Sequence, residues 1–294
     1  MNLRDLQYLV AVAEQKHFGK AAQACFISQP ALSMQIKKLE NTLGVQLFER
    51  THNSVLLTDV GKIICERARN ILVQTKEIQD IAQQAKNPFM GELRVGIIPT
   101  IAPYLLPHIM PGLSKLFPQL TLYLVEAQTS QLIEKLQTGK LDVALLALPI
   151  TEQDLVTVSL FEEEFLLAVP NQHALAKRKI IKSTDLENLT LLLLEDGHCL
   201  REQALTVCHR ANAVEAKGFQ ATSLETLRHM VAAQAGITLM PKLACKSNDG
   251  ISYIPFRSPK PMRTVGLIWR ASTARKALLD KLSCELKKLI VKHI

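Results

Sequence analysis

The sequence of 294 residues lacks any apolar run near the ~18 residues that a membrane-spanning helix needs. Its first residues, MNLRDLQYLVAVAEQ, carry charge too early for a signal peptide and offer no cleavage site. It also lacks internal repeats, low-complexity segments and a glycine-rich loop that could cradle a phosphate. These absences predict a cytoplasmic protein without a membrane partner, in which a disulfide would be transient rather than structural.

The composition is typical of a globular protein with two or more domains. Hydrophobic residues make up 48% of the chain and charged residues 21%. The net charge of +8 is compatible with an anionic partner such as nucleic acid, although it does not identify one.

Residues 1–58 predict a winged helix-turn-helix. An apolar stripe over 3–15 and a short alanine-rich segment, 18–24, precede the tight turn 25–27 and a helix that Ser28 would cap. The outer face of this third helix and the wing after it carry groups that reach base edges or phosphates. The predicted DNA-binding residues are Gln29, Pro30, Ser33, Lys37, Lys38 and Arg50.

Two short strand-like runs within 45–58 surround His52-Asn53-Ser54, a tripeptide that tolerates tight turns, and so predict the wing. Residues 59–87 then predict one long helix. Ile64, Ile71 and Ile78 recur every seven residues along it, which favours a dimerisation seam, although a helix packed on its own domain is the alternative.

Residues 88–294 alternate between strand-like and helical segments, which predicts an α/β domain with a mainly parallel sheet. We expect two Rossmann-like lobes, of the type 2 periplasmic-binding-protein kind, with a ligand cleft between them. The expected lobes are 88–161 plus 266–294, and 162–265. Thr100 and Thr129 each open a helix directly after a strand, at the carboxyl edge of the sheet, and so would face this cleft.

The segment EDGHCLREQALTVC (195–208) predicts a helix with a cysteine at each end, Cys199 and Cys208. Nine residues of helix span about 13.5 Å, whereas bonded cysteines need Cα atoms about 4.4–6.8 Å apart. A bond between the two would therefore require the helix to unwind. Cys199 would lie in the first turn, where His198 and Arg201 could lower its pKa. The alternative is that both thiols are small buried hydrophobes.

The stretch FGKAAQACFISQPALSMQIKKLENTLGVQLFER (18–50) resembles the N-terminal module of LysR-type transcriptional regulators, and the remainder is similar to their effector domain. The resemblance covers essentially the whole chain. Four more stretches are similar to the hydrogen peroxide sensors of that family: IPTIAPYLLPHI (98–109), EAQTSQL (126–132), LEDGHCLREQA (194–204) and ATSLETLRHMVAA (221–233).

This resemblance implies that peroxide oxidises Cys199 to a sulfenic acid and that Cys208 then forms a Cys199–Cys208 disulfide. Refolding between them would re-orient the subunits of a homotetramer on double-stranded DNA and change transcription of oxidative-stress genes, with RNA polymerase as a further partner. The resemblance also implies that Thr100, Thr129 and His198 bind peroxide and that Arg263 lies near the reactive thiol. We expect no cofactor. We also expect no metal, because the pairs His198-Cys199 and Cys208-His209 lie about 13.5 Å apart along a helix.

Two other functions stay open. A LysR-type regulator could bind a small organic effector, with the threonines holding a carboxylate at a helix N-terminus and both cysteines incidental. An enzyme could use Cys199 as a nucleophile with a histidine base, but His198 is its chain neighbour, and the helix-turn-helix argues against an enzyme. The other cysteines are interpreted as structural: Cys25, Cys65, Cys245 and Cys284.

Overall fold

The computed structural model of the protein describes residues 1–50, 55–84, 87–211 and 213–291. The chain divides into two compact units, Met1–Gln83 and Gln84–Ile294, each with a hydrophobic core of its own. Among the described residues, no helix combines the length and the apolar character that crossing a bilayer requires.

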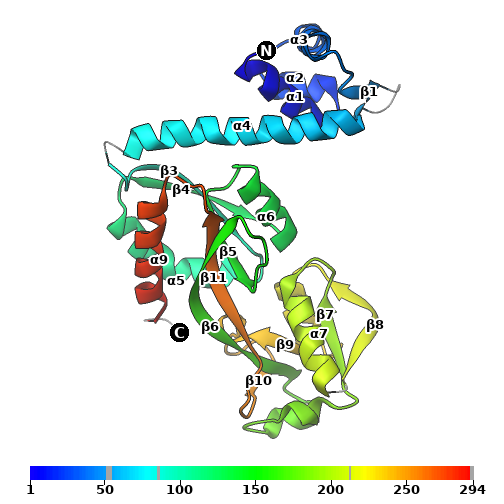
Figure 1. Ribbon diagram of the computed structural model, residues 1–294. Coiled ribbons are helices and arrows are strands. Elements are labelled where there is room, and N and C mark those ends of the chain that lie inside the picture. Colours follow the sequence, from blue (N-terminus) through cyan, green and yellow to red (C-terminus); the bar gives the residue numbers. More distant parts are fainter. Residues whose placement is uncertain (51–54, 85–86, 212, 292–294) are drawn as a thin grey trace. The chain divides into compact units, whose positions relative to one another are not determined.

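The first unit is the predicted winged helix-turn-helix followed by a long helix (Figure 1). Its elements are α1 Leu3–Gln15, α2 Phe18–Ala24, α3 Gln29–Leu43, β1 Phe48–Arg50, β2 Val55–Leu57 and α4 Asp59–Gln84. The strands β1 and β2 pair antiparallel, as a wing does. The expected turn His52-Asn53-Ser54 lies outside the described residues.

The helix α3 forms where its caps and apolar spacing predict it. Ser28 Oγ accepts a hydrogen bond from the backbone N–H of Ala31, and Gly44 ends the helix in the left-handed conformation at φ +71°. One face of the helix, Leu32, Ile36 and Leu39, is buried in the core of the unit. The opposite face is therefore left to solvent.

The turn between α2 and α3 closes through two nested backbone hydrogen bonds. The N–H of Phe26 donates to the carbonyl of Gln23, and the N–H of Ile27 donates to that of Ala22, each at 3.1 Å. This is a Schellman motif, whose central residue must be left-handed and is usually glycine. Here that residue is Phe26, at φ +56°, where a side chain costs about 1–2 kcal/mol.

The long helix α4 changes character along its length. Thr58 Oγ1 accepts a hydrogen bond from the N–H of Gly61 at 2.9 Å and so caps the start of the helix. Cys65 and Ala68 are buried in the core of the first unit, whereas Ile71 and Ile78 are 40% and 66% exposed. Only the later part of the predicted heptad seam is therefore free to meet a partner.

Gly61 lets the first turn of α4 approach the backbone of Leu47, just before β1, and we expect Gly61→Ala to destabilise this unit by about 1–3 kcal/mol. A Cβ at this position would press into the backbone carbonyl of Leu47, which cannot swing aside as a side chain could. Urea denaturation followed by circular dichroism measures the effect. The exposed neighbour variant Lys62→Ala is the control and should change stability by less than about 0.5 kcal/mol. Equal stability of Gly61→Ala and the control would contradict the expectation.

The second unit holds the other elements. These are β3 Gly91–Ile97, α5 Ala102–Leu116, β4 Leu120–Glu126, α6 Thr129–Gln137, β5 Val143–Leu148, β6 Leu155–Pro170, η1 Ala174–Lys177, η2 Ser183–Leu186, β7 Thr190–Leu194, α7 Cys199–Ala211, β8 Val214–Ala221, α8 Leu224–Ala232, β9 Thr238–Pro241, η3 Lys242–Ala244, β10 Ile251–Pro255, β11 Met262–Arg270 and α9 Lys276–Val291. The three η elements are short 3₁₀ turns.

One sheet runs in the order β10-β6-β11-β5-β3-β4, with β9 also paired to β6. β3 is parallel to β4 and β5, but β11 is antiparallel to β5 and β6, and β6 is antiparallel to β9 and β10. The expectation of a mainly parallel sheet is therefore wrong. β6 carries the chain from one lobe to the other and β11 returns beside it in the opposite direction, so the two must pair antiparallel (Figure 1).

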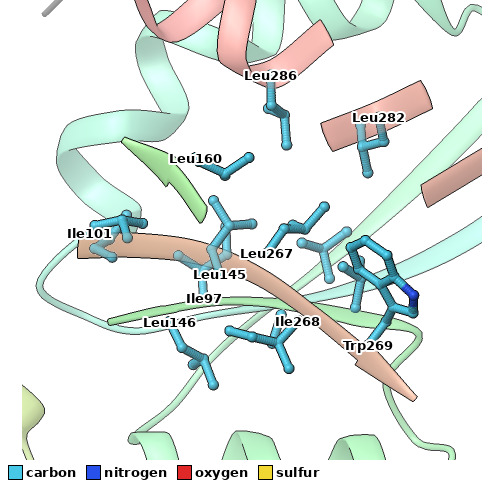
Figure 2. Packing of buried hydrophobic residues seen from close by; sticks show 14 of the residues in the cluster. Ile97, Ile101, Leu145, Leu146, Leu160, Leu267, Ile268, Trp269, Leu282 and Leu286 are labelled. Atoms are coloured by element: carbon cyan, nitrogen blue, oxygen red, sulfur yellow. The ribbon is translucent and has the colours of Figure 1, made fainter. Parts of the chain in front are cut away.

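The two long strands join two lobes with separate cores. The core of the first lobe gathers side chains from β3, β5, β11, α5 and α9, and the core of the second from β7, α7, α8 and β9. Figure 2 shows Leu282 and Leu286 of α9 turned toward the strand residues Leu145 and Leu267. Each such buried leucine contributes about 1.5–3 kcal/mol. The exact lobe limits expected above stay a prediction, since β6 and β11 belong to both.

Candidate functional site

The two predicted redox cysteines lie on one helix but enter different cores. β7 ends at Leu194, Gly197 turns the chain at φ +92°, and α7 begins at Cys199. Cys199 is half-buried against the core of the first lobe, whereas Cys208 is 1% exposed within the core of the second. Both are free thiols. A helix therefore separates them, as the spacing predicts.

The groups that tune Cys199 are not the ones expected from its chain neighbours. Burial raises the pKa of the Cys199 thiol, while the Arg263 guanidinium, the Thr129 hydroxyl and backbone groups of Leu200 and Ala147 act to lower it. The expectation that the pKa of Cys199 is lowered is therefore wrong, and the groups that act most strongly to lower it are Arg263 and Thr129 rather than the expected His198 and Arg201. The pKa of the Cys199 thiol therefore lies above its ordinary value, and the thiol stays protonated at neutral pH. Arg263 and Thr129 are the groups that would favour the thiolate.

Arg201 is occupied by other partners, which explains why it does not serve the thiol. Its Nε donates to Asp196 Oδ1 at 2.7 Å, and its two terminal nitrogens donate to Glu215 Oε1 at 2.6 Å and Oε2 at 3.0 Å. It also reaches the carbonyl of Leu194 at 3.2 Å. Arg201 therefore ties the first turn of α7 to the end of β7 and to β8.

Arg263 is the centre of a fully buried polar cluster beside Cys199. Its Nε donates to Glu163 Oε2 at 2.7 Å, and neither side chain of this ion pair is exposed. Its other nitrogens donate to the hydroxyl and to the carbonyl of Thr100, each at 3.0 Å. Glu163 Oε1 in turn accepts from the N–H of Leu243 at 2.9 Å. Thr100 and Arg263, proposed separately from the sequence, are thus direct partners.

Thr129 and His198 each present a buried polar atom, Thr129 Oγ1 and His198 Nε2. In the described part of the chain His198 Nε2 has no hydrogen-bond partner, and Thr129 Oγ1 has none of ordinary geometry, although it lies near enough to the Cys199 sulfur to favour the thiolate. The nearest ion-pair partner of His198 Nε2, Glu195 Oε1, is 3.9 Å away. Both residues, with Cys199, line an open pocket of about 490 Å³. A buried polar atom without a hydrogen bond costs free energy. These two atoms would therefore favour the binding of a small polar molecule that supplies hydrogen bonds to them.

Cys208 lies apart from this pocket. Burial, reinforced by the charge of Glu215, raises the pKa of Cys208 to about 11, so its thiol stays protonated at neutral pH. The structure thus brings Thr129 and His198 into one pocket with Cys199, and places Arg263, which binds Thr100, near enough to act on the thiol, but it does not bring Cys208 there.

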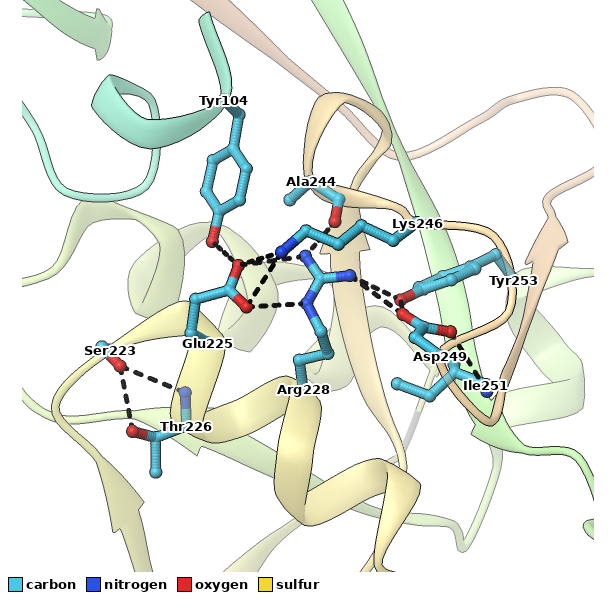
Figure 3. Close-up of polar contacts among 10 residues, drawn as sticks. All are labelled: Tyr104, Ser223, Glu225, Thr226, Arg228, Ala244, Lys246, Asp249, Ile251 and Tyr253. Carbon is cyan, nitrogen blue, oxygen red and sulfur yellow. Dashed lines mark hydrogen bonds and ion pairs between the residues drawn. The ribbon is translucent and has the colours of Figure 1, made fainter. Parts of the chain in front are cut away.

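A second buried arginine belongs to a polar cluster that links the two lobes (Figure 3). Arg228 of α8 pairs with Glu225 at 3.2 Å and with Asp249 at 3.0 Å, and it also donates to the carbonyl of Ala244. Tyr104 of α5, on the other lobe, donates its hydroxyl to Glu225 Oε1 at 2.9 Å. Burial and the bond to Glu225 hold the pKa of Tyr104 well above its ordinary value, so this donor does not ionise near neutral pH.

The predicted DNA-binding residues lie on α3 and the wing of the first unit. Gln29, Pro30, Lys37 and Lys38 are exposed and Ser33 is half-buried, as expected for the outer face of the helix. Arg50 is the last residue of β1, and its side chain lies outside what the structure describes.

Glu163 is the member of the site that the sequence analysis missed. It is the middle residue of the run Glu162–Glu164 in β6, and alternation along the strand places it on the side opposite its two neighbours. Glu163 shares the inward side of β6 with Phe165, and a carboxylate on that side indicates a buried counter-ion. The counter-ion is Arg263, which lies directly opposite Glu163 on the neighbouring strand β11.

Comparison with known families agrees with both units. Residues 3–62 match the model of the bacterial regulatory helix-turn-helix proteins of the lysR family, and residues 86–288 match that of the LysR substrate-binding domain. The chain belongs to the LysR family. The winged helix-turn-helix and two-lobed α/β fold expected for a LysR-type protein are confirmed.

Within the LysR family the chain groups with OxyR proteins. It is 48% identical over 286 residues to the hydrogen peroxide-inducible genes activator of Escherichia coli, covering 96% of this chain and 94% of that protein. Full-length OxyR C199D from Pseudomonas aeruginosa is 40% identical, covers 98% of this chain and 95% of that one, and has a TM-score of 0.78. The crystal structure of the oxidized form of OxyR is 45% identical, covers 71% of this chain and all of that one, and has a TM-score of 0.66.

Proposed function

We propose that the protein is a DNA-binding transcriptional regulator that senses hydrogen peroxide through Cys199 and a Cys199–Cys208 disulfide. The observation that carries this proposal is the pocket at Cys199, which Thr129 and His198 line with buried polar atoms, beside a thiol on which the buried Arg263 guanidinium acts. The likeness to a hydrogen peroxide-inducible genes activator supports the same function.

The pocket suits a small, neutral molecule that both donates and accepts hydrogen bonds. Peroxide can accept from the Thr129 hydroxyl and exchange a hydrogen bond with His198 Nε2. Loss of the thiol proton to water would leave a thiolate that Arg263 and Thr129 stabilise. The thiolate sulfur then attacks one peroxide oxygen, the O–O bond breaks, and the departing hydroxide takes up a proton to become water. Cys199 is left as a sulfenic acid.

The second step joins the two cysteines. The Cys208 sulfur attacks the sulfenic sulfur, an S–S bond forms, the S–O bond breaks, and the hydroxyl leaves as water with the Cys208 proton. Because Cys199 and Cys208 begin at the two ends of a helix and in two cores, this step requires α7 to unwind and Cys208 to leave the second core. Each chain reacts with one peroxide and then stays oxidised until its disulfide is reduced, which is the behaviour of a sensor rather than of an enzyme with multiple turnovers.

The change in α7 would reach DNA through assembly of the chain. The free later part of α4, with Ile71 and Ile78 exposed, is the surface we assign to dimerisation. The outer face of α3 and Arg50 would contact the duplex, and a homotetramer would couple the regulatory units to RNA polymerase in the cytoplasm.

The deciding experiment is peptide mass mapping after a brief, roughly stoichiometric dose of hydrogen peroxide, with free thiols alkylated. The expected product is a Cys199–Cys208 cross-linked peptide. Two free thiols at these positions would overturn the sensor and favour a regulator of an organic effector. A lone sulfenic acid on Cys199 would remove Cys208 from the mechanism.

Glu215→Gln should make the disulfide easier to form. The variant weakens the bidentate grip on Arg201 that holds the first turn of α7, and so destabilises the reduced form relative to the oxidised one. Losing a charged hydrogen bond at this partly exposed carboxylate corresponds to about 1–2 kcal/mol, or a reduction potential about 20–40 mV more negative.

Equilibration in glutathione buffers measures that potential. Glu202→Gln, an exposed substitution of the same kind in the same helix turn, is the control and should leave it unchanged. Equal potentials for the two variants would show that Arg201 does not restrain α7.

A further inference from the structure

Phe26 is built into the turn of the helix-turn-helix in a way that folding alone does not explain. Its side chain is 95% exposed, more than any other large apolar side chain among the described residues. Its backbone is left-handed at φ +56°, a conformation that glycine or asparagine adopts at lower cost. The position therefore carries a bulky ring that gains nothing from packing and strains the chain.

The turn itself does not need a ring. Its shape comes from the backbone bonds of Phe26 and Ile27 to the carbonyls of Gln23 and Ala22, and from Ile27, which packs against the core. These are the features of a Schellman motif, which glycine serves best at the central position. What the phenylalanine adds is an apolar surface directed outside the unit.

We propose that Phe26 is a DNA-contacting residue whose ring packs against apolar parts of the duplex, a thymine methyl or deoxyribose, at the edge of the groove that α3 enters. This inference rests on the proposed DNA-binding function. It adds an apolar contact, which would recognise a methyl group or the shape of the duplex rather than the charge of a phosphate.

The location of Phe26 supports DNA as the occupant. It stands two residues before Ser28, the cap of α3, and three before Gln29, so its Cα lies within about 11 Å of the first residues of the recognition helix. In helix-turn-helix proteins these first residues contact base edges. A ring so close to them meets the wall of the same groove.

The surroundings also favour DNA over a protein partner. Gln23, Ser28 and Gln29, the polar residues on either side, are exposed. A stable protein interface needs a contiguous surface of roughly 800 Å² on each side, whereas DNA offers small apolar targets between charged phosphates. Phenylalanine against a thymine methyl is one of the contacts by which major grooves are read.

The test compares Phe26→Asn with Phe26→Tyr in the full-length protein. Asparagine tolerates the left-handed backbone but removes the ring, so the Tm of the variant should not fall. Its affinity for a duplex selected by the wild-type protein from a random pool should fall about tenfold, which equals ~1.4 kcal/mol. Phe26→Tyr keeps the ring and should bind within about twofold of wild type.

Salt dependence separates this contact from a phosphate contact. The slope of log K against log salt should be unchanged in Phe26→Asn, because no charge is lost, but shallower by about 1 in the control Lys37→Ala. The thymines of the duplex can also be replaced one by one with uracil, which lacks the methyl group. The affinity of the wild-type protein should then fall at one position or at none. In the first case the ring meets a methyl group, and in the second it packs on sugar.

Other outcomes overturn the inference. A DNA contact is excluded if Phe26→Asn binds the duplex with wild-type affinity. It is also excluded if only the sedimentation of this variant changes, a result that would indicate that Phe26 contacts a second copy of the chain. A loss shared equally by Phe26→Tyr would assign the effect to the turn and not to the ring. Failure of the wild-type protein itself to select any duplex would instead refute DNA binding as a whole.

Discussion

Cys199→Ser should abolish the response to hydrogen peroxide while leaving affinity for DNA unchanged. A serine hydroxyl does not become the nucleophile that a thiolate is, so we expect its reaction with peroxide to be at least about a hundredfold slower. The substitution is close in size and lies in the second unit, so the helix-turn-helix is untouched. Peroxide-dependent transcription in vitro and DNA binding under reducing conditions measure the two properties.

Two further cysteine variants make this result specific. Cys208→Ser should still form a sulfenic acid at Cys199 but no cross-link. Cys284→Ser removes an exposed thiol on α9 and should respond as wild type does. A normal peroxide response in Cys199→Ser would refute the proposal that Cys199 senses peroxide. A lost response in Cys284→Ser would show that the reactive site has been assigned to the wrong cysteine.

Arg263→Met should cost both stability and reactivity. It leaves Glu163 as a buried carboxylate without its partner, and breaking such a pair costs about 3–5 kcal/mol. It also removes the charge that lowers the pKa of Cys199. With that charge gone the pKa rises, the thiolate fraction at neutral pH falls, and the pH profile of alkylation at Cys199 should move to higher pH.

A second substitution separates the two effects. Glu163→Leu combined with Arg263→Met replaces the whole ion pair by apolar side chains, which is often nearly neutral for stability. We expect the double variant to regain most of its resistance to urea but to alkylate as slowly as Arg263→Met. The control Lys260→Met breaks a partly exposed pair with Glu164 of β6, just before β11, and should change stability by no more than about 1 kcal/mol. Recovery of reactivity in the double variant would contradict a role for the Arg263 charge.

The sequence predicted the elements whose signals are local. Ser28, Gly44 and Thr58 cap their helices through bonds within a few residues, and each was predictable from residue type and spacing. Cys199 at the first turn of α7 followed from a strand, a glycine and an apolar stripe in succession. Both Thr100 and Thr129 were placed by the rule that parallel strands end at one edge.

What the sequence did not predict depends on contacts between distant residues. β8 and β10 went unrecognised: β8, VEAKGFQA, has little apolar alternation and is a strand because β7 pairs with it. Arg201 was assigned to the thiol because it is near in sequence, yet it belongs to Glu215 on β8. The antiparallel course of β11 beside β6 follows from the two crossings between lobes, which no local pattern encodes.

The division of Cys199 and Cys208 between two cores sets a time scale for the proposed switch. The reactive sulfur can be oxidised in place, but the second step must wait until Cys208 leaves its core, a local unfolding that takes microseconds to seconds. A sulfenic acid reduced within that interval returns the protein to its starting state with no change of shape. The buried partner would therefore delay the switch, and its outcome would depend on whether a reductant reaches the sulfenic acid before Cys208 does.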